Sequence, residues 1–167
     1  MIFDRMKNRL LLTFLLLMPA CLAIADEKPA QQTQTAPQTQ EVVAVNYEVI
    51  QQGTYSGMKE SFAGVIKNKK DWQDLWKKHV GLIVPQPPLP EVNFDNEVVA
   101  AIFAGEKRTS GYQILPQEIK TEGNDVVLRY RQTEPPANSF TLQVLTQPHL
   151  MIKIQKPKNG IVKLLKE

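Results

Sequence analysis

From Val42 to the C-terminus, the sequence is a succession of short segments in which apolar and polar residues alternate. A period of two is typical of β-strands that bury one face, and the Gly, Asn and Pro residues between the segments indicate turns. We therefore expect about seven strands. They lie at residues 42–50, 98–104, 112–119, 126–131, 140–144, 150–154 and 161–165, with a short further strand at 62–66. Asn159-Gly160 predicts a hairpin turn before the last strand.

One helix interrupts this pattern. Asp71 has the residue type of an N-cap, and Gly81 suits a left-handed stop. Between them, apolar side chains recur with the i, i+3, i+4, i+7, i+8 spacing of one helix face, at Trp72, Leu75, Trp76, His79 and Val80. Such a stripe usually packs on a core, so we expect His79 to be buried there. The alternative is that Trp72 and Trp76 form a stacking surface for a ligand.

Three further features favour a layered β fold. The near-continuous apolar run Val98–Ala104 predicts a strand that is buried on both faces. Val84–Pro90 holds four prolines and predicts an extended, rigid connector. Pro116 interrupts another strand and indicates an edge position or a bulge. Together they predict a mainly β (α+β) fold, an antiparallel β-sandwich or open barrel of about seven strands with one covering helix.

The N-terminus has the features of an export signal. Three basic residues precede the apolar run Leu10–Met18, which is too short to span a bilayer, and a small-x-small cleavage pattern ends at Ala25. We expect residues 1–25 to be a signal peptide and the protein to work outside the cytoplasm, in the periplasm or at the cell surface. In the alternative, Leu17–Cys21 is a lipobox, and Cys21 carries a lipid that anchors the chain.

The remaining chain divides into a spacer and a domain. Residues 26–41 are mostly Gln, Thr, Ala and Pro and contain no large apolar residue, so burial cannot offset their ordering entropy. We expect a disordered spacer there and a single β-rich domain at 42–167.

Composition excludes several classes of function. The 167 residues carry a net charge of only +3, and no clustered basic stretch indicates nucleic-acid binding. One cysteine and two histidines argue against a Cys- or His-based metal site. The sequence has neither a glycine-rich phosphate loop nor a GxSxG serine. We therefore expect no catalytic residue, no metal and no cofactor.

Two segments between strands contain residues suited to binding. Thr109-Ser110-Gly111-Tyr112 follows the apolar strand, and Pro148-His149 precedes another strand. Loop residues on a rigid β-scaffold are a frequent place for binding function, although Gly111 is equally suited to a plain tight turn. The hypothesis is that Thr109, Ser110, Gly111, Tyr112, Pro148 and His149 bind a protein partner.

Seven short motifs follow one another over residues 47–165. They are Tyr55-Ser56-Gly57, the Trp72–Trp76 helix, Pro90–Phe94, Val98-Val99, Gly105-Glu106, Thr109–Tyr112 and Leu145–Pro148. Their order and spacing resemble the C-terminal domain of the PrcB family, which are extracytoplasmic subunits of protease complexes. Asn93, Ser110 and His149 depart from the family's pattern. The resemblance implies a non-catalytic accessory domain, often exported or lipid-anchored, that binds or stabilises a secreted protease.

Three loops are also similar to those of chagasin-like peptidase inhibitors, which are immunoglobulin-like sandwiches. These loops are Thr109–Tyr112, Pro135–Ser139 and Thr146–His149, and we expect them to gather at one end. The predicted function is therefore an exported, non-catalytic domain that partners an extracytoplasmic protease. One alternative is a peptidase inhibitor that acts through the three loops. The other is an envelope lipoprotein with a ligand-binding role.

Overall fold

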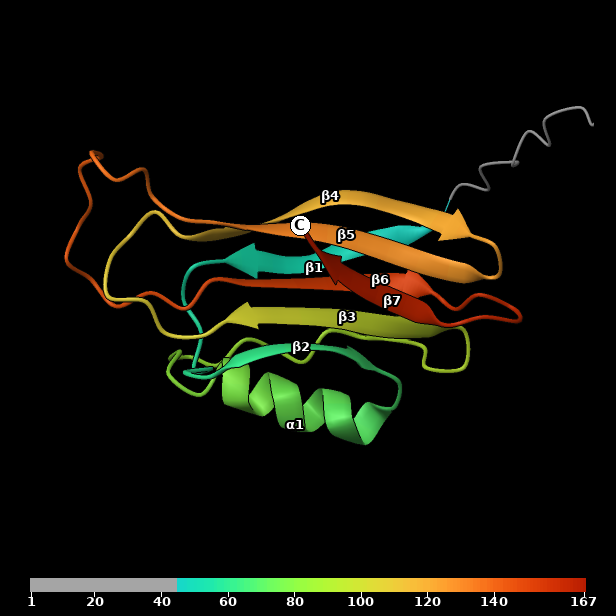
Figure 1. The fold of residues 1–167 in the computed structure, drawn as a ribbon. Helices are drawn as coiled ribbons and strands as arrows, with labels where there is room; N and C mark the ends of the chain where they lie inside the picture. Colours follow the sequence, from blue (N-terminus) through green and yellow to red (C-terminus); the bar gives the residue numbers. More distant parts are fainter. Residues whose placement is uncertain (1–44) are drawn as a thin grey trace, which may run out of the picture. The chain divides into compact units, whose positions relative to one another are not determined.

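The structure is a computed structural model that describes residues 45–167. Seven strands and one helix follow one another in these residues (Figure 1). They are β1 (Tyr47–Gly53), β2 (Ser61–Ile66), α1 (Lys69–His79), β3 (Glu97–Ala104), β4 (Gln113–Glu122), β5 (Asp125–Thr133), β6 (His149–Gln155) and β7 (Val162–Lys166). The signal peptide expected at 1–25, the lipid on Cys21 and the spacer at 26–41 lie outside the described residues.

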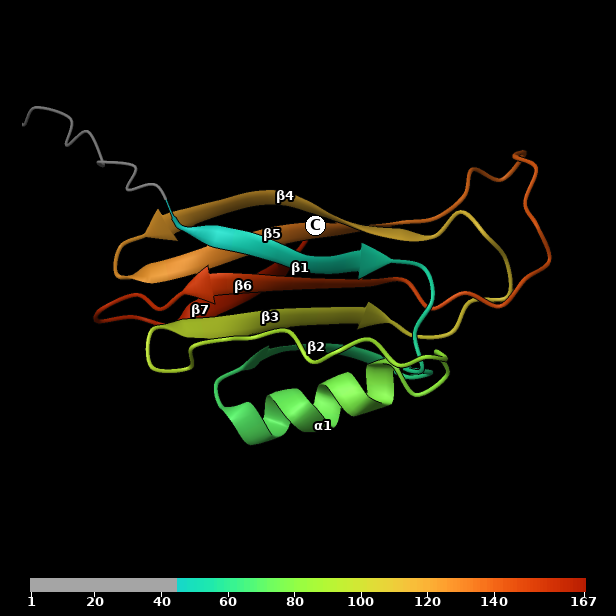
Figure 2. The ribbon, with the colours of Figure 1, turned by 180° about the vertical axis from the view of Figure 1, so that it is seen from behind.

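The strands form two sheets. One has the order β1-β6-β3-β2 and is antiparallel throughout, and the other has the order β4-β5-β7. In the second sheet β4 and β5 are antiparallel, whereas β5 and β7 are parallel. Figures 1 and 2 show the two sheets stacked on each other, with α1 against the outer face of the larger one. The mainly β fold with one covering helix is therefore confirmed, and the two sheets of the described residues do not close into a barrel.

The main core lies between the two sheets. Strands β3 and β6 supply it from one side, and β4 and β5 from the other. Its buried members are Val98, Ala100, Ile102, Ile114, Val126, Leu128, Tyr130, Leu150, Ile152 and Ile154. The inward positions expected on β5 are thus confirmed at Val126, Leu128 and Tyr130. Burial of these side chains is the main favourable contribution to folding.

A second core lies between α1 and the larger sheet. The whole apolar stripe of the helix is buried in it, against the other face of β3 and β6. Both indole N–H groups are satisfied, because Trp72 Nε1 donates to Pro90 O at 3.0 Å and Trp76 Nε1 donates to Pro87 O at 3.3 Å. The tryptophans therefore pack on the core and also hold the proline-rich connector along the helix.

The ends of α1 differ from the sequence prediction. Asn68 is the N-cap, and its side-chain oxygen accepts the Asp71 N–H at 2.9 Å, so the helix begins before Asp71. At the other end Gly81 is not in the left-handed region, and the N–H of the C-cap Val80 donates to Trp76 O at 2.9 Å. The helix has 11 residues, and in the described part of the chain no helix is long and apolar enough to span a membrane.

Two strand predictions are wrong. Residues 140–144 are not part of either sheet, because the chain there crosses from β5 in one sheet to β6 in the other. Asn159-Gly160 is not a hairpin turn, because β6 and β7 also belong to different sheets. The bulge expected at Pro116 is confirmed, since the register of β4 against β5 shifts between Pro116 and Glu118, and β4 is an edge strand.

Asn68→Ala is expected to destabilise the protein by about 1 kcal/mol, because the side chain that satisfies an orphan N–H of the first turn is lost. Asp71→Ala is the matched control and is expected to cost about 0.5 kcal/mol or less, because only an exposed hydrogen bond and a helix-dipole interaction disappear. The free energy of unfolding in urea distinguishes the two variants. A larger loss for Asp71→Ala would show that the helix begins where the sequence alone suggested.

Candidate functional site

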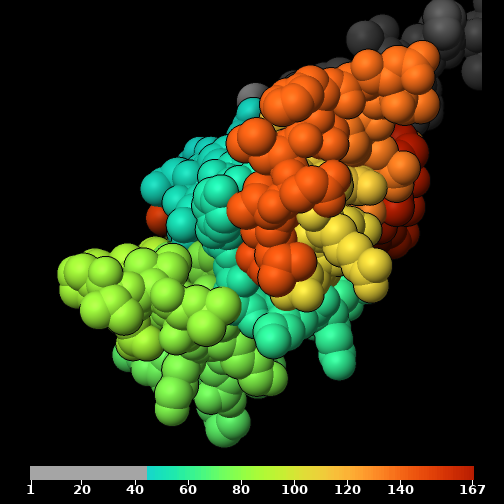
Figure 3. Space-filling model, turned by 90° about the vertical axis from the view of Figure 1, so that its left-hand side faces the viewer, coloured from blue at the N-terminus to red at the C-terminus, as the bar shows by residue number. Residues whose placement is uncertain are grey.

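Three loops meet at one end of the sandwich, which we call the loop end. They are the β1–β2 loop (54–60), the β3–β4 loop (105–112) and the β5–β6 loop (134–148). Figure 3 looks onto this end, where the orange β5–β6 loop lies across the yellow β3–β4 loop and next to the teal β1–β2 loop. β1 and β3 end here and β4 and β6 begin here, so the strand pairing itself brings the loops together.

Hydrogen bonds hold these loops against one another. Lys107 N–H donates to Thr146 O at 2.7 Å, and Thr146 N–H returns a bond to Lys107 O at 2.9 Å. The Thr146 hydroxyl donates to Thr109 O at 3.0 Å, and Gln147 N–H donates to Thr54 O at 2.7 Å. The β5–β6 loop is thus fixed to both of its neighbours at its C-terminal part.

A second set of contacts fixes the middle of the β5–β6 loop. Leu142 N–H donates to Ser110 Oγ at 2.9 Å, and Ser110 N–H donates to Leu142 O at 3.0 Å. Gly111 has φ +97°, and a Cβ there would lie 2.8 Å from Pro135 Cβ. Glycine is therefore required at 111 both by its backbone conformation and by the close approach of the two loops.

The structure brings all six residues of the sequence hypothesis to the loop end. Gly111 is exposed, and Thr109, Ser110 and Tyr112 are half-buried, with Lys107 Nζ 5.3 Å from the centre of the Tyr112 ring. Pro148 and His149 are buried and support the loops from below. The three loops compared with chagasin-like inhibitors, which include Pro135–Ser139, do gather at one end. Binding of a partner by these residues stays a prediction.

The most exposed apolar side chains of the loop end were not part of that hypothesis. Phe140 is 92% exposed, Tyr55 62%, Leu142 58% and Leu145 53%. The sequence contained a signal for the β5–β6 loop, since Phe140, Leu142 and Val144 alternate with polar residues. That alternation predicted a strand with a buried face, whereas the structure leaves most of this face in solvent.

Beneath the loop end lies a buried polar cluster around His79 and His149. The two rings are 4.5 Å apart between centroids and meet edge to face. His79 Nε2 lies 2.9 Å from Gln51 Oε1, which only accepts, so this nitrogen carries the proton. His79 Nδ1 then accepts the hydroxyl of Ser56 at 2.9 Å. A neutral ring therefore has both nitrogens satisfied.

The cluster reaches into the loops through Gln147. Its side-chain oxygen accepts Ser56 N–H at 3.4 Å, and its side-chain nitrogen donates to Glu106 at 3.3 Å. His149 Nδ1 donates to Gln147 O at 3.3 Å, while Nε2 of the same ring is buried without a partner among the described residues. All three loops and the C-terminal end of α1 are therefore connected to one network.

Burial keeps both histidines neutral. Burial is the larger cause and the neighbouring His149 the smaller one that together lower the pKa of His79 to about 4. Burial also lowers the pKa of His149, although the hydrogen bond to Gln147 O opposes this. Ser56 and His79 have the spacing of a nucleophile and its base, but Ser56 is only 4% exposed and accepts Met58 N–H at 3.1 Å. Neither residue lines the polar pocket or the open groove described below.

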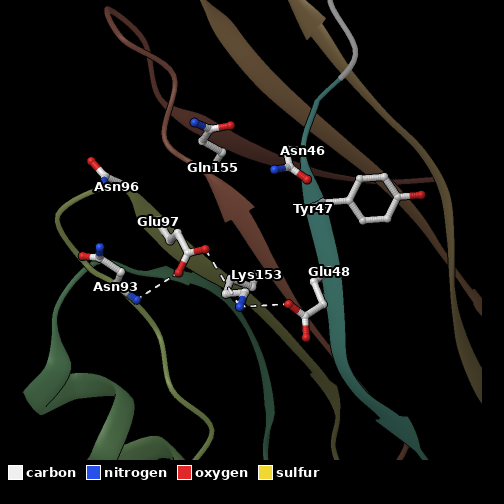
Figure 4. Close-up of a pocket in the computed structure, with 8 residues that line it drawn as sticks. All are labelled: Asn46, Tyr47, Glu48, Asn93, Asn96, Glu97, Lys153 and Gln155. Carbon is white, nitrogen blue, oxygen red and sulfur yellow. Dashed lines mark hydrogen bonds and ion pairs between the residues drawn. The ribbon is translucent and has the colours of Figure 1, made fainter.

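A polar pocket of about 240 Å³ lies at the other end of the larger sheet (Figure 4). Lys153 lies at its centre, 2.8 Å from a carboxylate oxygen of Glu48 and 3.9 Å from one of Glu97. The hydrogen bond to Glu48 raises the pKa of Lys153. Two carboxylates against one ammonium leave the pocket with a net charge of −1. Both carboxylates already have partners, since Lys153 pairs with each of them and the Asn93 N–H also donates to Glu97.

An open groove of about 690 Å³ shares Glu97 and Lys153 with this pocket and is lined by Trp72 and Phe94. Trp72 is only 1% exposed, so it closes the bottom of the groove and offers no ring face for stacking. Across residues 45–167, no group of three or more His, Cys, Asp or Glu side chains lies close enough together to hold a metal ion.

A comparison with known protein families gives a match over the segment from β3 to β6, which includes the β3–β4 loop and the β5–β6 loop. Residues 98–155 match the family described as PrcB C-terminal. The resemblance to the PrcB family is therefore confirmed over this segment, and it is consistent with an accessory domain of a protease complex. No curated protein and no solved structure matches the chain.

Acid is expected to destabilise the domain through its buried histidines. The pKa of His79 falls from about 6.5 in the unfolded chain to about 4 in the fold, so the unfolded chain takes up the proton first. His79 leaves the free energy of unfolding unchanged above pH 6.5 and lowers it as the pH falls from 6.5 to 4. At pH 5 the loss from His79 alone is about 2 kcal/mol.

The measurement is the free energy of unfolding in urea at pH 8 and pH 5, for the wild type and for His79→Gln. The variant lacks the titrating ring, so it is expected to lose about 2 kcal/mol less than the wild type between the two pH values. Equal losses for both proteins would contradict the role given to His79.

Proposed function

We propose that this protein is an exported, non-catalytic accessory domain that binds an extracytoplasmic protease, and that it docks through the loop end. The PrcB match over residues 98–155 supports the protease complex. The signal-like sequence at 1–25 supports export. In the alternative form of the exported protein, a lipid on Cys21 anchors the chain to the membrane.

The observation that carries the proposal is a rigid loop end with exposed apolar side chains. Phe140 and Leu142 lie on a loop that is hydrogen-bonded to its neighbours. A loop that is ordered before binding loses little conformational entropy when a partner covers it. Exposed aromatic residues surrounded by polar groups are also typical of the centre of a protein interface.

The expected energetic contribution is largest at Phe140. Its ring is 92% exposed, so nearly the whole side chain is available to a partner. Full burial of a phenylalanine contributes about 2 to 3 kcal/mol. Tyr112 and Tyr55 belong to the other two loops and add rings that also offer a hydroxyl group.

A peptidase inhibitor is the second candidate, because the three loops that resemble chagasin do lie at one end. In this function the loops enter the active-site cleft of a peptidase as a wedge. The fold analogy alone does not establish it. The discriminating assay is titration of cysteine and serine peptidases with the purified protein. Inhibition of a peptidase near a one-to-one molar ratio supports the inhibitor function. Full peptidase activity across the panel contradicts it and favours the non-inhibitory docking domain.

Phe140→Ser and Leu145→Ser are expected to reduce recovery of a protease partner by at least about tenfold, because they remove apolar contact area at the loop end. Ile161→Ser is the matched control, since Ile161 and Leu145 are both 53% exposed and Ile161 belongs to the β6–β7 connection at the opposite end.

The measurement is affinity capture from the native envelope with each variant as bait, followed by identification of the bound proteins. The three variants are expected to unfold at the same urea concentration as the wild type, because the substituted side chains are exposed. Equal recovery with Phe140→Ser and with Ile161→Ser would refute docking through the loop end. Failure of the wild type to recover any protease would refute the proposed function itself.

A further inference from the structure

Residues 140–145, which we call the free segment, have the sequence of a strand but belong to no sheet. Phe140, Leu142 and Val144 alternate with Thr141 and Gln143, and aromatic and β-branched residues of this kind favour extended chains. The segment lies in the middle of the β5–β6 loop. Its local preference therefore disagrees with its structure, a conflict that is common at functional sites.

The backbone of the free segment is only half satisfied. On one side, the N–H and C=O of Leu142 both bond to Ser110. In the described part of the chain, the N–H groups of Thr141, Gln143 and Leu145 have no partner. In an extended chain alternate residues direct their backbone groups to the same side, so these three would form one edge of a strand if the segment were fully extended.

Three of the four edge strands of the two sheets have features that protect them against pairing with another chain. β1 has a bulge between Val49 and Gln51, β4 has Pro116 together with a bulge, and β7 carries Lys163 and Lys166. The fourth edge strand, β2, has no bulge, proline or lysine and is therefore the edge against which the free segment has to be compared. Bulges, proline and lysine are the usual means by which natural edges avoid further strands.

The free segment has none of these protections. No charged residue occurs between Glu134 and Lys153, and the only prolines nearby lie outside the segment. Phe140, Leu142 and Leu145 are all more than half exposed. An unprotected backbone edge with exposed apolar side chains is a template for an added strand.

We propose that the free segment pairs with an extended strand of the protein partner, which thereby adds to the β5–β6 loop. The inference rests on the proposed function, because it assigns the occupant of the loop end. The occupant is an uncharged, extended stretch of polypeptide with apolar side chains at alternate positions. Its backbone bonds to Thr141, Gln143 and Leu145, and its apolar side chains cover those of the free segment.

Pairing requires one local change in the loop. Val144 N–H donates to Leu142 O at 3.0 Å, a tight turn centred on Gln143 that bends the chain. This bond has to open for the segment to become fully extended. The Ser110 contacts do not have to change, because they lie on the other side of Leu142. The segment is therefore held at one edge while the other accepts the partner.

The test is a titration of the ¹⁵N-labelled protein with a short blocked peptide of alternating Thr and Val, followed by NMR. The control peptide has the same sequence with N-methyl groups on alternate residues, which removes its donors on one edge. We expect the amide signals of residues 140–145 to shift with a Kd of about 1 mM or below, and the methylated peptide to leave them unchanged. Unmoved signals at saturating peptide, or shifts confined to the edge strands β1, β2, β4 or β7, would overturn the inference.

A pair of variants separates the backbone from the side chains. Gln143→Pro removes one free N–H and tolerates an extended chain, whereas Gln143→Ala keeps the N–H. We expect Gln143→Pro to weaken peptide binding at least about fivefold and Gln143→Ala to leave it within about twofold. Equal binding by both variants overturns strand addition. Because the peptide titration needs no natural partner, failure to capture a protease counts against the proposed function and leaves this result intact.

Discussion

The antiparallel pairing of β3 with β6 is the interaction on which the rest of the structure depends. Residues 98–103 face the two cores alternately, and the same holds for residues 150–152 of β6. The second sheet packs on one side of this pair and the helix on the other. The pairing of Phe103 with His149 also sets the place where the β3–β4 and β5–β6 loops leave the sheet. A shift in this register would therefore change both cores and the loop end together.

The loop end depends on this pair through buried polar groups as well. His149 begins β6, and it contacts His79 from the helix and Phe103 from β3. In the low-dielectric interior a hydrogen bond between such groups is strong. A buried polar group that lacks its partner destabilises the fold by a comparable free energy. Among the described residues, His149 Nε2 is the one side-chain atom of this network that is buried without a partner. The network therefore favours this arrangement of the loops over alternatives in which more of its donors and acceptors would be unsatisfied. Apolar packing alone specifies loop positions less sharply, because it has no direction.

The sequence predicts the interior better than it predicts the connections. The double burial of Val98–Ala104 and the stripe from Trp72 to Val80 follow from local periodicity, which the cores confirm. The alternation of apolar and polar residues does not show which sheet a strand joins. It therefore predicts neither the parallel pairing of β5 with β7 nor the absence of residues 140–144 from both sheets. The gathering of the loops was expected by analogy, whereas the exposure of Phe140 and the His79–His149 contact need the three-dimensional arrangement.

The direction of β1 has a practical consequence for the whole domain. Tyr47 pairs with Ile154 and Gly53 pairs with His149, so the chain enters at the end of the sheet remote from the loops (Figure 1). A strand of this length extends roughly 20 Å. A handle fused ahead of Val45, or a surface to which it is coupled, therefore holds the molecule by its far side and leaves the loops accessible.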